Sequence, residues 1–339
     1  MNETPSINWE KPYKSWVLTI VLADPDLSWQ PHHDATKRWE SVRPENVPVL
    51  VEGLNYFMPL TIQEVTPLST ATTKNAHTAW DFTLELEDDC AFFGMHGLVK
   101  DALDGFKLDW CIHPLDDAFP RRKALLMSDM DSTFLEGECI DELADFVGKK
   151  AEVARITEAA MNGTLNFEDA LIERVALLKG LPVASVHHVL DATPRMAGAK
   201  TLVDTMRHLG CFNVLVSGGF TPFTQALCDE LRLDAHQANQ LEEANGVFTG
   251  QVIPPILGKE AKLEALHYYS KRLSIPLEAT LTVGDGANDL LMLQASGLGV
   301  AFHSKKAVHE QSRASVRFND LSALLYFQGI PQSDWTIVS

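Results

Sequence analysis

Cysteine is scarce in this sequence: the five cysteines among its 339 residues show no pattern of disulfide pairs. They are odd in number and widely spaced, and they form neither a Cys-x-x-Cys pair nor a zinc-ligand pattern. Disulfides persist in oxidising compartments, so scattered single thiols indicate a reducing environment. We therefore expect a cytoplasmic protein with buried free thiols.

Long hydrophobic runs are also missing. No apolar stretch reaches the ~18 residues that a membrane-spanning helix requires, and residues 1–16 are too polar for a signal peptide. These absences predict a soluble protein without a membrane partner.

Positive charge is in short supply. Lysine and arginine number 28 against 46 aspartates and glutamates, which gives a formal net charge of −18. Such a charge opposes binding to phosphate backbones, so we expect no nucleic-acid partner. A small anionic substrate stays compatible with it, because a metal ion or a few local cations can reverse the charge inside one cleft.

The sequence has no repeats or low-complexity tracts, so domain boundaries must come from changes of pattern. A chain of this length exceeds what one hydrophobic core usually supports. We predict a flexible tail over residues 1–14, an N-terminal domain over 15–115 and a second domain over 116–339.

The N-terminal domain shows the order βαββαβ, which predicts a small α+β ferredoxin-like fold. The expected elements are strands at 15–24, 60–68, 78–87 and 107–115 and helices near 46–57 and over 89–105. The pattern resembles the amino-acid-binding ACT domains, although no diagnostic residue supports the resemblance. A regulatory ligand site, a structural role and a homodimer through this domain all stay open.

The second domain is predicted to be α/β. Short apolar runs at 124–129, 211–219 and 279–285 end in small or acidic residues, and a helical segment follows each. This alternation predicts a Rossmann-like three-layer fold with a parallel sheet, in which ligands bind at the carboxyl ends of the strands. A helical insertion over about 138–195 is expected to form a cap.

The first polar cluster is Asp129 and Asp131 in the sequence DMDST, directly after the first apolar run. Two carboxylates at a strand end can point into one cleft. The alternative is structural, since aspartate and serine often end strands and cap helices. A calcium EF-hand loop is excluded because its remaining ligands and its glycine are absent.

The second cluster is Ser217 and Gly218 in VSGGF. A hydroxyl and exposed backbone N–H groups at a strand-to-helix junction suit an anion such as phosphate. A tight glycine turn without a ligand is the alternative.

The third cluster is Asp285 and Asp289 in GDGAND, where hard carboxylate oxygens suit Mg²⁺. An aspartate-capped helix is the alternative. Lys259 and Lys262 precede this strand; most such lysines are solvated surface charges, but a phosphate in the cleft would require a cation.

In this order, DMDST, SGG, a lysine and GDGAND resemble the haloacid-dehalogenase superfamily of phosphohydrolases. The cap sequences ECIDELA and NFEDALIERVALLKGLP narrow the resemblance to the phosphoserine phosphatase family. The resemblance covers about residues 123–304. It implies Mg²⁺-dependent hydrolysis of O-phospho-L-serine through an aspartyl-phosphate, the last step of serine biosynthesis. A phosphatase for another small metabolite and a non-catalytic amino-acid sensor are the alternatives.

The resemblance also implies residue roles. Asp129 would be the nucleophile and Asp131 the general acid and base, while Asp129, the backbone carbonyl of Asp131 and Asp285 would hold Mg²⁺. The implied substrate contacts are Ser217, the Gly218 amide and Lys262 for the phosphate, Glu138 for the ammonium, Arg174 for the carboxylate, and Met161 and Phe167 closing the pocket. Asn288 and Asp289 would lie one layer further out and support the residues that hold the metal and the phosphate.

Overall fold

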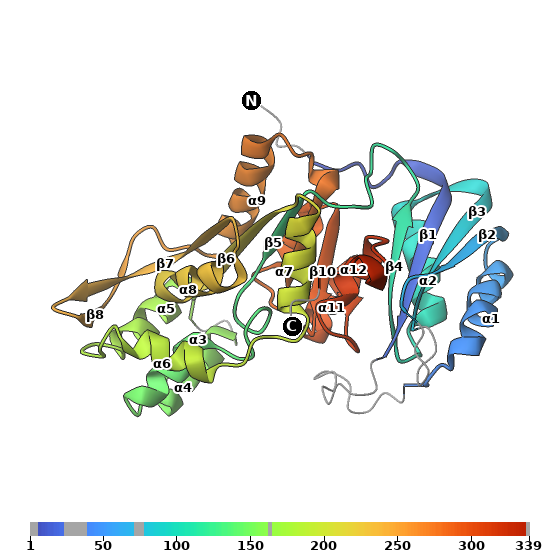
Figure 1. Ribbon diagram of the computed structural model, residues 1–339. Helices are drawn as coiled ribbons and strands as arrows, with labels where there is room; N and C mark the ends of the chain where they lie inside the picture. The colour runs from blue at the N-terminus through green and yellow to red at the C-terminus, as the bar shows by residue number, and fades with distance from the viewer. Residues whose placement is uncertain (1–5, 24–38, 71–77, 162–164, 337–339) are drawn as a thin grey trace.

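The computed structural model describes residues 6–23, 39–70, 78–161 and 165–336 (Figure 1). The described strands form one 11-stranded sheet in the order β2-β3-β1-β4-β11-β10-β9-β5-β6-β7-β8. The first four strands in this order belong to the N-terminal module, and the others belong to the core of the second domain and its β7–β8 hairpin. Figure 1 shows the two parts side by side along this sheet.

The N-terminal module has the βαββαβ order that the sequence predicts. Its elements are β1 Pro12–Leu22, α1 Val47–Glu52, β2 Leu60–Pro67, β3 Ala79–Ala91, α2 Phe92–Leu103 and β4 Leu108–Pro114, with 3-10 turns at Pro44–Asn46 and Gly53–Tyr56. Its strands pair antiparallel in the order β2-β3-β1-β4. Trp16, Phe82 and Val99 contribute to its own buried core.

The start of the chain differs from the predicted tail over residues 1–14. Strand β1 already begins at Pro12, and the Trp9 ring lies 4.7 Å from the ring of Phe92, centroid to centroid. Aromatic side chains in the polar segment provide the reason, because burying such rings stabilises the fold. The segment from Trp9 onward therefore belongs to the N-terminal module.

The core sheet is parallel across β10, β9, β5, β6 and the start of β7, as predicted. Its strands are β5 Leu125–Ser128, β6 Phe212–Phe220, β7 Ala235–Ala244, β8 Val247–Ile253, β9 Thr280–Gly284, β10 Leu298–Phe302 and β11 Ala314–Val316. The helices outside the cap are α7 Ala199–His208, α8 Thr221–Leu231, α9 Lys259–Leu273, α10 Leu290–Ala295, α11 Lys306–Gln311 and α12 Ala323–Phe327, with 3-10 turns at Leu277–Ala279 and Gln332–Asp334.

Alternate side chains of each core strand point to opposite faces of the sheet. In β5, Leu126 packs in the hydrophobic cluster that contains Leu202 of α7, whereas Leu125 packs in the cluster that contains Leu266 of α9. Two apolar layers therefore sandwich the sheet, and the three-layer α/β prediction is confirmed.

The predicted cap is present as four helices, α3 Cys139–Phe146, α4 Lys150–Met161, α5 Phe167–Ala176 and α6 Ser185–Ala192. Asn166 caps α5, as predicted, because its side chain accepts a hydrogen bond from the Asp169 backbone N–H at 2.8 Å. The cap also meets the β7–β8 hairpin, where the Gly180 N–H donates to the Phe248 carbonyl at 2.8 Å. Figure 1 shows this hairpin extending from the sheet beside α5.

The junction between module and core is built from buried polar groups. The Asp109 carboxylate accepts from the backbone N–H groups of Arg317 and Phe318 and from the Asn319 amide, at 2.8–3.1 Å. Strand β4 also pairs with β11. Because one sheet crosses the junction, the domain boundary near residue 115 stays a prediction.

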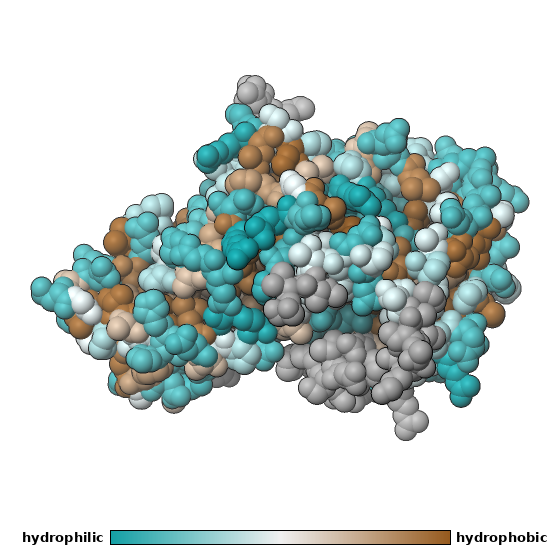
Figure 2. Space-filling model, viewed as in Figure 1, coloured by the Kyte–Doolittle hydropathy of each residue, from teal (hydrophilic) through white to brown (hydrophobic). Residues whose placement is uncertain are grey.

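The described helices include none long and apolar enough to cross a membrane. On the face shown in Figure 2, hydrophobic residues are interspersed with hydrophilic ones.

Candidate active site

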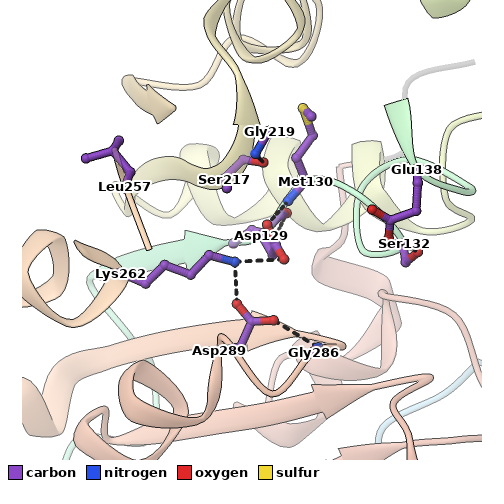
Figure 3. Close-up of polar contacts among 12 residues, drawn as sticks. Asp129, Met130, Ser132, Glu138, Ser217, Gly219, Leu257, Lys262, Gly286 and Asp289 are labelled. Carbon is purple, nitrogen blue, oxygen red and sulfur yellow. Dashed lines mark hydrogen bonds and ion pairs between the residues drawn. The ribbon is translucent and has the colours of Figure 1, made fainter. Parts of the chain in front are cut away.

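The site lies at the carboxyl ends of the core strands, where parallel α/β sheets bind ligands. Strand β5 ends at Ser128, and the next residue, Asp129, still pairs with β9, since its N–H donates to the Val283 carbonyl at 3.0 Å. The Asp129 carboxylate is 5% exposed and accepts from the Met130 N–H at 2.7 Å. The strand register thus fixes this carboxylate in the cleft (Figure 3).

Lys262 provides the positive charge beside Asp129. Its Nζ lies 2.7 Å from an Asp129 oxygen and 2.6 Å from an Asp289 oxygen. Burial alone would lower the pKa of Lys262, but the two carboxylates outweigh burial and raise it. Lys259, in contrast, is exposed and lies 3.6 Å from Glu260. The structure therefore brings Lys262 into the site and leaves Lys259 outside.

Three carboxylates crowd together at this edge. Ligand oxygens of Asp129, Asp285 and Asp289 lie within 4.8 Å of one another. Burial, followed by the negative charge of Asp129, raises the pKa of Asp285 to about 8 and that of Asp289 to about 7. Asp289 joins this cluster directly, whereas the sequence predicts it behind the metal ligands. The hard oxygens of three carboxyl groups, opposed by the single positive charge of Lys262, fit a Mg²⁺ ion.

Asp131 lies in a different environment from Asp129. Its Oδ1 accepts from the Cys139 N–H at 3.1 Å. Burial, then the charge of Glu138, raises the pKa of Asp131 to about 8. The raised pKa favours the protonated form of Asp131, whereas the Asp129 carboxylate is paired with Lys262. The two aspartates that the sequence places side by side differ in environment as acid and nucleophile require.

The SGG segment, residues 217–219 near the end of β6, lies at the same edge of the sheet. Ser217 is buried, and its Oγ accepts from the Gly219 N–H at 2.8 Å. A Cβ atom on Gly219 would lie only 3.0 Å from Asp131 Oδ2. Only glycine leaves room for this approach, so the ends of β5 and β6 meet closely. Asn288 lies over the glycine turn of the third cluster, where a Cβ on Gly286 would collide with its Oδ1.

Two predicted cap residues carry charge. Glu138 immediately precedes α3 and accepts a hydrogen bond from Ser132 Oγ at 3.3 Å. Although Glu138 is exposed at the mouth of the site, protein atoms around its carboxylate and the charge of Asp129 raise its pKa. Arg174 is half-buried in α5 and donates to the Ala170 carbonyl at 3.2 Å. Among the described residues, no carboxylate lies within ion-pair distance of Arg174.

The cap touches the SGG segment through Phe167, the first residue of α5. A Cβ on Gly218 would lie 3.5 Å from Phe167 Cζ. The structure thus places Phe167 over the predicted phosphate site. The side chain of Met161, the other residue predicted to close the pocket, lies outside the described residues.

Sequence reasoning missed two features beside the site. Asn239 of β7 hydrogen-bonds to Gly218, and no local pattern indicated this. The β7–β8 hairpin did have a signal, because Asn245 and Gly246 form its turn with φ angles of 53° and 78°. Asn-Gly is the typical sequence of such a turn.

The motif order, the fold and the acidic cleft define a hydrolase class. The family model for haloacid dehalogenase-like hydrolases matches residues 126–294, and the chain belongs to this family.

Several relatives are phosphoserine phosphatases. That of Idiomarina loihiensis is 41% identical over 201 residues, which cover 59% of this chain and 91% of that protein. That of Mycobacterium tuberculosis is 42% identical over 214 residues, which cover 63% of this chain but only 52% of that protein, so the match spans about half of its length. The unliganded crystal structure of a probable phosphoserine phosphatase from Vibrio cholerae superposes with a TM-score of 0.64 at 28% identity, covering 97% of this chain and 90% of that one.

Proposed function

We propose that the chain is a Mg²⁺-dependent phosphoserine phosphatase, which releases L-serine and phosphate from O-phospho-L-serine as the last step of serine biosynthesis. The observation that carries this proposal is the contrast between Asp129, paired with Lys262 at 2.7 Å, and Asp131, whose pKa is raised to about 8. One carboxylate is prepared to attack and its neighbour to donate a proton. The five cysteines are free, which suits the cytoplasm.

The acidic cluster supports a bound Mg²⁺. Asp129, Asp285 and the backbone carbonyl of Asp131 would hold it, with Asp289 adjoining. When bound, Mg²⁺ supplies positive charge to the phosphate oxygens and offsets the repulsion among the carboxylates. Lys262, which pairs with Asp129 and Asp289 of this cluster, would neutralise another phosphate oxygen.

Asp129 and Asp131 divide the chemistry between them. The Asp129 carboxylate attacks phosphorus, and the bond from phosphorus to the serine oxygen breaks as the aspartyl-phosphate forms. Because Asp131 Oδ1 accepts from the Cys139 N–H, its proton resides on Oδ2 and passes to the departing serine oxygen. Ionised Asp131 then takes a proton from water, which attacks phosphorus and releases phosphate from Asp129.

The cap supports specificity for an amino-acid phosphate. Arg174 has no carboxylate partner among the described residues, so the substrate carboxylate would complete a bidentate pair. Glu138, at the mouth of the site, would accept the substrate ammonium. A substrate without these groups would leave both charges unpaired, which disfavours simple alkyl phosphates.

A panel of phosphorylated metabolites tests the assignment. With Mg²⁺ present, phosphate release should be most efficient from phosphoserine. A higher kcat/KM on another small phosphate ester would instead support the alternative of a phosphatase for that metabolite. No phosphate release from any ester would favour the non-catalytic sensor.

The N-terminal module would add an ACT-like regulatory or dimerising role. Strand β2 lies at the edge of the sheet, and Tyr56 and Phe57 nearby in sequence are 89% and 63% exposed. Exposed apolar side chains of this kind favour an interface. Light scattering on the full chain tests for a homodimer, and serine titration tests for a ligand; a monomer that does not bind serine would refute the role.

A further inference from the structure

We propose that Asn239 is a positioning residue, which ties the phosphate-binding segment of β6 to the segment that leads into α9. Asn239 lies in β7 and is 1% exposed. Its side-chain amide donates to the Gly218 carbonyl at 2.9 Å and its oxygen accepts from the Leu257 N–H at 2.7 Å. One buried amide therefore joins two backbone segments that each lead to a proposed phosphate ligand.

The irregular pairing of β6 with β7 explains why this amide is needed. The register runs through Val216 and resumes only at Phe220, so Gly218 lies in the gap between ladder pairs. Buried backbone carbonyls need hydrogen-bond partners, and the Asn239 side chain provides one that the ladder does not. Asn239 also accepts from Thr221 Oγ1 at 2.9 Å through its own carbonyl, which links it to the start of α8.

The first consequence concerns the orientation of Ser217. The carbonyl of Gly218 and the N–H of Gly219 belong to one peptide plane, and this N–H donates to Ser217 Oγ at 2.8 Å. Asn239 holds the opposite end of the same plane. Because a peptide group is rigid, fixing the carbonyl also fixes the donor that orients the hydroxyl.

The second consequence concerns the position of Lys262. Leu257 is followed by Gly258, the N-cap of α9, and this helix carries Lys262 toward Asp129. Figure 3 shows Leu257 and Ser217 on separate segments, both above the Lys262 side chain in this view. The Asn239 amide thus sets the spacing between the SGG segment and this helix.

The cap rests on both tied segments. The Phe167 ring lies 3.5 Å from a Cβ built on Gly218 and 3.7 Å from one built on Gly258. Loss of the Asn239 link would disturb both the phosphate ligands and the surface on which Phe167 sits. The inference rests on the proposed phosphate site, but it does not depend on which phosphate ester is the substrate.

Asn239→Ala and Asn239→Asp test the inference, with Asn213→Ala as the matched control. Asn213 is another fully buried asparagine, at the opposite end of β6, and within the described part of the chain its side-chain amide donates only to the Cys211 carbonyl, at 3.0 Å. Asn239→Asp keeps an acceptor for the Leu257 N–H and removes the donor to Gly218. It therefore keeps the test decisive if Asn239→Ala does not fold.

The full chain is assayed with Mg²⁺ on phosphoserine and on p-nitrophenyl phosphate. We expect kcat/KM of both Asn239 variants to fall about tenfold or more on both esters, because the shared phosphate group is misaligned. Asn213→Ala should stay within about twofold of wild type. Equal activity losses in the Asn239 and Asn213 variants, or none in the Asn239 variants, would overturn the inference.

Thermal unfolding with inorganic phosphate and Mg²⁺ adds a readout that requires no turnover. Phosphate should raise the Tm of wild type and Asn213→Ala, but raise that of the Asn239 variants much less. An unchanged phosphate shift in the Asn239 variants would contradict the inference. If wild type bound phosphate but hydrolysed p-nitrophenyl phosphate and not phosphoserine, the proposed function alone would fail.

Discussion

Two carboxylates in different regions of the molecule, Asp109 at the junction and Asp285 at the active site, have contrasting surroundings. At the junction, both oxygens of Asp109 accept N–H donors, from Arg317, Phe318 and Asn319. At the active site, Asp285 accepts no hydrogen bond among the described residues, and burial with the charges of Asp129 and Asp289 raises its pKa to about 8. Burial raises the pKa of Asp109 as well, so Asp109 and Asp285 differ in the hydrogen bonds that they accept and not in the direction of the pKa shift.

This difference distinguishes a carboxylate that stabilises the fold from one that suits a ligand site. A buried carboxylate surrounded by donors stabilises the fold, because removing it leaves several backbone groups unpaired. A crowded carboxylate without donors destabilises the fold unless a cation arrives. Asp109 is of the first kind and docks the N-terminal module, whereas Asp285 is of the second kind, which suits the Mg²⁺ site proposed above.

The largest expected effect is on kcat, when Asp285 at the active site is replaced. Asp285→Asn should lower kcat by about 100-fold or more, because it weakens the metal site. Its Tm in EDTA should equal or exceed that of wild type, since one carboxyl of a crowded cluster becomes neutral. Turnover assays and thermal unfolding check both parts; a large loss of metal-free stability would contradict the distinction.

A substitution at the junction should lower stability and leave kcat unchanged. Asp109→Ala is expected to lower the free energy of unfolding by about 3 kcal/mol, because three N–H donors lose their buried acceptor. Denaturant unfolding measures this, and kcat per folded molecule should be unchanged. Asp109→Asn should cost less, because its amide oxygen still accepts. A fall in kcat without a loss of stability would show that the junction takes part in catalysis.

Arg174→Ala should impair the hydrolysis of phosphoserine more than that of a substrate without a carboxylate. Without the guanidinium, kcat/KM on phosphoserine should fall about 10- to 100-fold, because the substrate carboxylate loses a charged partner. Phosphoethanolamine lacks that carboxylate, so its weaker hydrolysis should change little. Equal losses on the two substrates would mean that Arg174 does not bind the carboxylate.

Gly219→Ala should have a smaller effect, confined to the site. The new Cβ would lie 3.0 Å from both Asp131 Oδ2 and Ser217 Oγ, so these groups must shift. We expect kcat to fall about tenfold. Gly97→Ala is the control, since nothing lies within 4 Å of its Cβ position. If kcat of Gly219→Ala matched this control, the close approach of Asp131 would not matter.

The smallest expected effect is on the pH dependence of stability. A folded-state pKa of about 8 for Asp285 and about 7 for Asp289 means that the metal-free native state binds more protons than the unfolded state from about pH 4 upward. Stability in EDTA should therefore decrease as pH rises toward 8. The Tm increase on adding Mg²⁺ should be larger at pH 8 than at pH 6; an increase independent of pH would contradict raised pKa values in this cluster.

Much of this site could be predicted from the sequence because its signals are local. Asp129 and Asp131 follow an apolar run directly, and the buried Lys262 lies in a short segment that resembles a known pattern. Asn239 could not be predicted, since its partners Gly218 and Leu257 are 21 and 18 residues away and one asparagine in a strand indicates no contact. The Asn245–Gly246 turn has a local signal in the sequence, although the β7–β8 hairpin is not among the predicted elements.

The junction could not be predicted either. Asp109 and Arg317 are 208 residues apart, and the pairing of β4 with β11 depends on tertiary packing rather than on local pattern. The sequence predicts a domain boundary near residue 115, and no local pattern indicates that one sheet continues across it. Long-range polar contacts of this kind have no periodic signature.

The central claim is that Asp129 attacks the phosphate of phosphoserine. The most direct test compares phosphate release from phosphoserine, with Mg²⁺ present, by wild type and by Asp129→Asn of unchanged circular dichroism. We predict release by wild type and a loss of at least about 1,000-fold in the variant, because an amide cannot form the aspartyl-phosphate. Substantial turnover by a folded Asp129→Asn variant would contradict the claim.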